Sequence, residues 1–120
     1  SIVDSQTEEA KNFTYEITKK VKANEPDTII YQYYFDSDDK VFLYEVYKGN
    51  DAAIMHVKDF RGSDWETRFG DLFVIDNFSV LGNSSEALKE SLEGYPASFR
   101  AIEGGFSRPA ESLGEEIFKL

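Results

Sequence analysis

The chain has 120 residues, a formal net charge of −10 and 41% hydrophobic residues, which fits one globular domain over residues 1–120 with a single core. The negative charge would repel phosphate backbones and disfavours a nucleic-acid partner, and the absence of cysteine excludes disulfides and thiolate catalysis. There is neither an apolar run of the roughly 18 residues that a membrane span needs nor a signal-peptide pattern, so we expect a cytoplasmic protein with no membrane partner.

The first predicted helix covers residues 7–22. Ser5 or Thr7 can cap it, and acidic residues in its first turn and lysines in its last turn match the helix macrodipole. Its apolar residues follow helical spacing and form one stripe: Ala10, Phe13, Ile17 and Val21. Pro26 disfavours helical backbone at the residue before it, so we expect the helix to end near residue 24.

The next segment predicts a β-hairpin. Residues 28–35 (TIIYQYYF) and 41–47 (VFLYEVY) are rich in β-branched and aromatic side chains, and the polar residues 36–39 form the turn between them. Apolar side chains occur on both faces of each strand. A strand with one face in water would alternate apolar and polar residues, so we expect this sheet to be covered on both sides.

The rest of the chain alternates helices and strands. We expect a helix over 51–60, a helical turn over 65–69, a strand over 72–81, a helix over 84–94, a strand over 98–107 and a surface tail over 109–120. This order predicts an α+β fold with a ferredoxin-like antiparallel sheet and helices on one face.

The residues around the hairpin carry a family resemblance. The run 24–31 (NEPDTIIY) with Tyr34 resembles the pattern "EPG, apolar, x, Tyr, x, x, Tyr" of the antibiotic biosynthesis monooxygenase family. The run 45–47 (EVY), two alanines and His56 resemble the strand of that family that ends in Glu-x-aromatic and the following helix, whose His lies eleven residues after the Glu. Family members begin with a strand before the first helix, where this chain has only residues 1–4 (SIVD). The resemblance implies a dimeric α/β barrel.

The two apolar faces of the hairpin also predict a partner. Helices cover one face of such a sheet, and a second copy of the chain, packed sheet on sheet at a spacing of about 10 Å, would cover the other. We therefore expect a homodimer. The same arrangement leaves room for a cavity lined by aromatic side chains, which suits a small apolar or aromatic ligand.

His56 is the candidate catalytic residue. It is the only histidine, and its side chain titrates near neutral pH, so it can accept a proton from a phenol. The resemblance implies that this position lies near the cavity. The alternative interpretation is a structural residue on an amphipathic helix.

Aromatic residues are the candidate substrate-binding groups. Tyr31, Tyr33 and Tyr44 can line a pocket or hydrogen-bond a ring, and Trp65 can close its mouth. The alternative is that they only fill a core. Glu45 lies between apolar neighbours in its strand and needs a partner, and we expect a structural ion pair with an arginine at 68, 100 or 108 rather than a catalytic acid.

Two main hypotheses follow. The resemblance implies a cofactor-independent monooxygenase that acts on a small aromatic, quinol-type substrate, with neither metal nor flavin. With one histidine and no cysteine, a metal site is also disfavoured by composition. The alternative is a non-catalytic dimeric module that binds a hydrophobic small molecule. Haem handling is a third possibility, which requires His56 as axial ligand.

Overall fold

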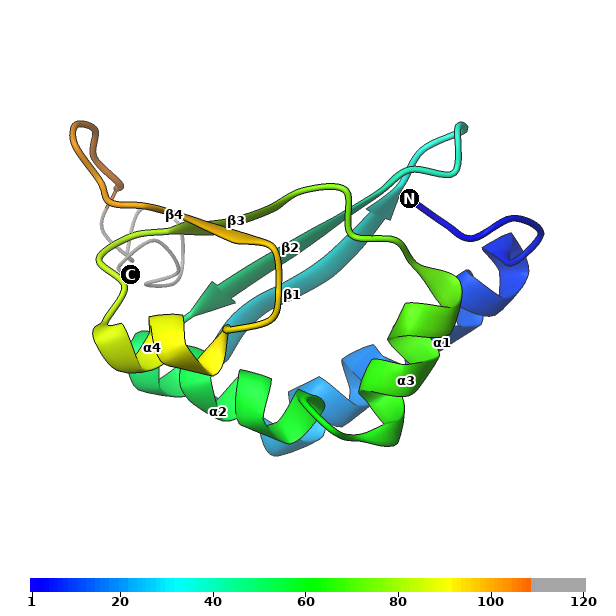
Figure 1. The fold of residues 1–120 in the computed structure, drawn as a ribbon, viewed down its shortest axis with the longest axis horizontal. Coiled ribbons are helices and arrows are strands. Elements are labelled where there is room, and N and C mark those ends of the chain that lie inside the picture. Colours follow the sequence, from blue (N-terminus) through cyan, green and yellow to red (C-terminus); the bar gives the residue numbers. More distant parts are fainter. Residues whose placement is uncertain (109–120) are drawn as a thin grey trace.

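The computed structural model describes residues 1–108, so the tail expected over 109–120 lies outside the described residues. The chain has an α+β fold (Figure 1). Its elements are α1 (Thr7–Asn24), β1 (Thr28–Phe35), β2 (Val41–Tyr47), α2 (Asn50–Phe60), α3 (Asp64–Leu72), β3 (Phe78–Leu81), α4 (Glu86–Ser91) and β4 (Ala97–Arg100). No helix in residues 1–108 is long and apolar enough to cross a membrane.

The strands pair differently from the single antiparallel sheet expected from the sequence. β1 and β2 form an antiparallel pair, whereas β3 and β4 form a separate parallel pair. The connection through α4 explains the parallel pairing, because a helical crossover carries the chain back to the end of the sheet at which the preceding strand began. In Figure 1 the helices α1, α2 and α3 lie on one side of the β1–β2 hairpin and the β3–β4 pair lies on the other.

Helix α1 supplies the centre of the core. The stripe predicted from the sequence is buried along its whole length: Ala10, Phe13, Ile17 and Val21. The expected caps do not form, because Gln6 occupies the N-cap position and its side chain makes no cap hydrogen bond. The helix ends where Pro26 predicts, and the backbone N–H of Glu25 donates to the carbonyl of Val21 at 2.9 Å.

The hairpin forms with the expected bounds. Its register places Tyr31 opposite Glu45 and Tyr34 opposite Phe42. Asp36 closes the turn, since its Oδ1 accepts from the backbone N–H groups of Asp38 and Lys40 at 2.8 and 3.0 Å. Alternate residues therefore divide between two faces, one toward the helices and one away from them.

The segment after α2 differs most from the prediction. Residues 64–72 form helix α3 where only a helical turn over 65–69 was expected, and the strand expected over 72–81 is confined to β3. The reason is helical spacing: the rings of Trp65 and Phe69 both pack on Phe13, with centroids 5.9 and 6.2 Å away, and Leu72 is buried.

The last elements are shorter than predicted. Helix α4 replaces the expected helix over 84–94, and its N-cap Ser85 accepts a hydrogen bond from the backbone of Leu88 at 3.1 Å. β4 covers only part of the strand expected over 98–107. At the other end, the backbone N–H of Ile2 donates to Asp39 at 3.0 Å and that of Val3 to Leu72 at 2.9 Å, so this segment joins the hairpin turn to the end of α3.

Candidate functional site

A buried polar cluster lies where α1, the hairpin and α2 meet. Glu25 follows the last turn of α1, Glu45 and Tyr47 come from β2, and His56 comes from α2. The local sequence explains these positions. The helix stops before Pro26, which leaves Glu25 at the C-cap of α1, and Gly49 ends the strand so that α2 begins within three residues of Tyr47.

The imidazole of His56 lies between two carboxylates. Its Nδ1 is 2.7 Å from Oε1 of Glu25, and its Nε2 is 3.2 Å from Oε1 of Glu45. The side chain of Glu25 is 0% exposed, that of His56 is 11% exposed and that of Glu45 is 25% exposed. The three groups therefore form a row that runs from the interior toward the surface.

Glu25 is held by further contacts from its own neighbourhood. The hydroxyl of Thr28 donates to its Oε1 at 3.1 Å, and Nζ of Lys20 lies 3.6 Å from its Oε2. Within residues 1–108, Oε2 has no hydrogen-bond partner. His56 and Lys20 face this buried carboxylate on two sides, which offsets part of the cost of burying its charge.

Tyrosines surround the outer end of the row. The hydroxyl of Tyr47 donates to Oε1 of Glu45, and the hydroxyls of Tyr31 and Tyr33 share a hydrogen bond of 2.8 Å. The rings of Tyr31 and Tyr47 lie 5.5 and 5.4 Å from the imidazole, measured between ring centroids. Aromatic walls therefore enclose the imidazole on two sides.

This environment changes the protonation of the cluster. Burial by itself lowers the pKa of His56, but the hydrogen bonds and charges of Glu45 and Glu25 outweigh burial and raise that pKa above its ordinary value of 6.5. Burial raises the pKa of Tyr31 far above its usual range, and the charge of Glu45 adds to that effect. The pKa values of Tyr33 and Tyr47 are also raised, chiefly by burial. The tyrosines therefore stay protonated near neutral pH.

The structure brings together three of the five residues predicted to form the site. Tyr31 lies beside His56, and Tyr33 joins the cluster through the hydrogen bond between its hydroxyl and that of Tyr31. Tyr44 belongs to the other face of the hairpin, where its ring stacks on that of Phe42 with centroids 6.2 Å apart. Trp65 packs on Phe13 in the core and does not join the cluster.

Glu45 has partners other than the arginines expected from the sequence. It binds His56 and Tyr47, while Arg68 pairs with Glu16 instead. Sequence reasoning did not predict Glu25 as a site residue: it was interpreted as part of the helix end and of the run 24–31 that carries the family resemblance. One sequence feature pointed to it: a charged residue immediately before a helix-ending proline, next to a strand that is apolar on both faces.

The cluster is not arranged around a central point. The two carboxylates approach opposite nitrogens of one ring. Accordingly, no group of three or more His, Cys, Asp or Glu residues in the described part of the chain has the geometry to hold a metal ion.

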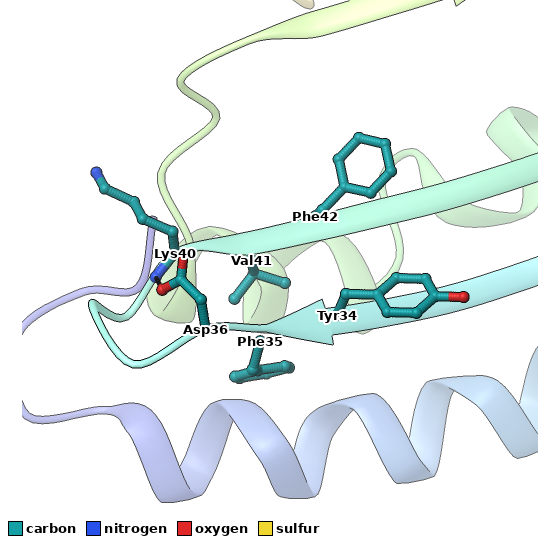
Figure 2. Close-up of a pocket in the computed structure, with 6 residues that line it drawn as sticks. All are labelled: Tyr34, Phe35, Asp36, Lys40, Val41 and Phe42. Atoms are coloured by element: carbon teal, nitrogen blue, oxygen red, sulfur yellow. Dashed lines mark hydrogen bonds between the residues drawn. The ribbon is translucent and has the colours of Figure 1, made fainter.

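The outer face of the hairpin is apolar and exposed. Tyr34 is 53% exposed and Phe42 is 65% exposed. A hollow of about 250 Å³ lies at the turn end of the hairpin (Figure 2). It is lined by Tyr34, Phe35, Asp36, Lys40, Val41 and Phe42. Figure 2 shows Phe42 pointing away from α1 and Phe35 pointing toward it.

Comparison with known proteins gives one structural likeness. No family model matches the chain, and no curated protein matches its sequence. The crystal structure of MupZ from Pseudomonas fluorescens has a similar fold, with a TM-score of 0.79 over 91% of this chain and 88% of that chain. The two sequences are 22% identical, so the likeness shows a shared fold alone.

Proposed function

We propose that the chain is an enzyme of the antibiotic biosynthesis monooxygenase type, which oxidises a small aromatic, quinol-type substrate without metal or flavin. The observation that carries this proposal is the position of His56, buried between Glu25 and Glu45 and walled by tyrosine rings. Burial, opposed charges and a histidine with a raised pKa are the features that active sites use to move protons.

The cluster suits the first step of such a reaction. Removing the proton from a phenolic O–H leaves an electron-rich anion, and the family resemblance implies that this anion then reacts with oxygen in a water-poor pocket. His56 serves as the base or as a hydrogen-bonding group in that step. Tyr31 and Tyr33 stay protonated because their pKa values are raised, and since their hydroxyls share one hydrogen bond, one of the pair has a hydrogen left to donate to the substrate oxygen.

The same proposal includes a ferredoxin-like half-barrel that pairs into a homodimer. Its support is the exposed aromatic face of the hairpin. Covering large apolar side chains such as Phe42 with a second sheet removes them from water, which is favourable. A cytoplasmic location belongs to the proposal as well, and the absence of cysteine fits a reducing compartment.

One observation favours the alternative, a non-catalytic dimeric module that binds a hydrophobic molecule. The hollow in Figure 2 is bordered by exposed aromatic side chains and lies apart from His56. Haem handling has less support, because both nitrogens of His56 already face carboxylates and neither is open to iron.

The deciding experiment combines oxygen uptake with a thermal shift in the presence of 1,4-naphthohydroquinone and simpler hydroquinones. We expect wild type to consume oxygen and to melt at higher temperature with a quinol, and His56→Gln to lose the oxygen uptake. Glu103→Gln serves as control, because Glu103 is exposed and distant in sequence from the cluster. Quinol binding without oxygen uptake in wild type would favour the module.

The dimer has its own test. Sedimentation of wild type and Phe42→Ser should show a dimer for the first and a shift toward monomer for the second. Phe106→Ser is the matched control, since Phe106 is also exposed but lies outside the hairpin. A monomeric wild type at tens of micromolar would contradict the homodimer.

A further inference from the structure

We propose that Glu45 is the catalytic residue that accepts the substrate proton, and that His56 and Glu25 are positioning residues behind it. This inference rests on the proposed function and assigns the roles within the same site. It reverses the sequence-based expectation, in which His56 is the base and Glu45 a structural partner. Three features of the cluster support it.

The first feature is the protonation that the geometry requires of His56. Both ring nitrogens lie within hydrogen-bonding distance of carboxylate oxygens, at 2.7 and 3.2 Å. An ionised carboxylate only accepts hydrogen bonds, so each nitrogen has to carry a hydrogen. With both carboxylates ionised, this arrangement favours the imidazolium, which has no lone pair with which to take a proton from a substrate.

The second feature is access. A catalytic group has to touch its substrate, and exposure rises along the row from Glu25 through His56 to Glu45. Within the described residues, the hydrogen bond from Tyr47 and the ion pair with His56 both involve Oε1 of Glu45. Oε2 of Glu45 therefore keeps its acceptor capacity for a ligand.

The third feature is the balance of charge behind Glu45. Glu25 faces two cations, the imidazolium and Nζ of Lys20 at 3.6 Å, so the interior end of the row is neutralised without Glu45. Glu25 holds the imidazolium in place, and the imidazolium orients Oε1 of Glu45. The other titratable groups whose rings face the imidazole, Tyr31 and Tyr47, are protonated near neutral pH and do not compete for the proton, and Phe60, which stacks on the ring, does not titrate.

The step itself is a simple proton transfer. The O–H bond of the phenolic substrate breaks, an O–H bond forms at Oε2 of Glu45, and the substrate keeps the electron pair as an oxyanion. Tyr31 lies opposite Glu45 in the hairpin register and shares a hydrogen bond with the hydroxyl of Tyr33, so one of these two protonated hydroxyls keeps a hydrogen that it can donate to that oxyanion. No electron changes hands in this step.

The test has a spectroscopic arm that needs no substrate. The chain contains a single histidine, so one pair of imidazole ¹⁵N resonances reports on the site. At pH 7 both nitrogens should show the shifts of an imidazolium, and Glu25→Gln and Glu45→Gln should each lower the pH at which His56 titrates. Neutral imidazole with one bare nitrogen in wild type would overturn the proposal whatever the activity.

The kinetic arm uses oxygen uptake with 1,4-naphthohydroquinone. Glu45→Gln should reduce kcat at least a hundredfold while the quinol still raises the melting temperature, and Glu45→Asp should recover part of the rate. Glu25→Gln should reduce kcat less and move the pH profile. Activity retained in Glu45→Gln but lost in His56→Gln would overturn the assignment and leave the proposed function standing. An inactive wild type would overturn the proposed function and the assignment together.

Discussion

Two clusters in residues 1–108 bring a carboxylate, a tyrosine and a cation together, one in the interior and one near the surface. The interior example is the row of Glu25, His56 and Glu45 with Tyr47. In the second example the hydroxyl of Tyr95 donates to Glu66, and the guanidinium of Arg61 lies 4.4 Å from the centre of the Tyr95 ring.

The two clusters differ in burial: Glu25 and His56 of the interior cluster are buried, whereas Glu66 and Tyr95 are partly exposed. Arg61 also donates to the backbone carbonyls of Ser91 and Glu93 at 3.0 and 2.6 Å, so the surface cluster fastens the corner between α2 and α3 to the end of α4. Burial and the hydrogen bond to Glu66 raise the pKa of Tyr95 to about 12, whereas burial raises the pKa of the interior Tyr47 well above its usual value. Similar residues make a clamp near the surface and, in our proposal, a proton site in the interior.

Removing the innermost carboxylate should have the largest effect on stability. Glu25→Ala leaves the imidazolium of His56 without its closest partner in a buried position, and we expect the free energy of unfolding to fall by about 3 to 5 kcal/mol. Urea unfolding measures this loss. Glu103→Ala, at an exposed position, should change it by less than about 0.5 kcal/mol. A loss in Glu25→Ala as small as the control would show that the row contributes no stability.

The pH dependence of stability should follow His56. Its pKa is raised in the folded chain above the ordinary 6.5, so its stabilisation is fully present below about pH 6.5 and is lost as pH rises through the folded value. Each unit of that difference is equivalent to about 1.4 kcal/mol. Urea unfolding between pH 5.5 and 9 should show this decline in wild type.

The same titration identifies the group responsible. In His56→Gln the free energy of unfolding should be nearly flat over this range. The lowered pKa of Glu66 cannot produce such a decline, because a lowered carboxyl pKa removes stability only as pH falls. An equal decline in His56→Gln would assign the pH dependence to another group.

The surface cluster should contribute less to the free energy of unfolding than the interior cluster. Tyr95→Phe removes the hydroxyl that binds Glu66 but keeps the ring beside Arg61, and we expect a loss of about 1 kcal/mol or less because both groups are partly exposed. The ¹⁵N resonances of His56 should stay unchanged in this variant. A movement of those resonances would show that the two clusters are coupled.

The smallest effect is expected at the edge of the interior cluster. Lys20→Met removes the ion pair between Nζ of Lys20 and Oε2 of Glu25. Their separation of 3.6 Å exceeds that of a good hydrogen bond, so the free energy of unfolding should change by less than about 0.5 kcal/mol. The His56 titration should move upward, because one positive charge has left its surroundings. A downward movement would mean that Lys20 acts on His56 through the position of Glu25.

Sequence patterns predicted the local elements better than their pairing. The stripe of α1, the hairpin bounds and α2 follow from periodicity and turn residues, and the structure confirms them. The length of helix α3 was underestimated, because the apolar residues Trp65, Phe69 and Leu72 also fit a short helical turn followed by a strand. The predicted partners of Glu45 were wrong. Arginine is a common ion-pair partner of a carboxylate, but the sequence does not show which cation lies near Glu45 in the fold.

The amino-acid sequence alone determined that this chain is a small α+β protein with an aromatic hairpin and a single histidine, since composition, periodicity and turn chemistry act over neighbouring residues. Only the tertiary structure decided that Glu25 and Glu45, twenty residues apart, meet the two sides of His56. That meeting depends on how α1 and α2 pack on the hairpin, and packing between distant segments leaves no periodic trace in the sequence.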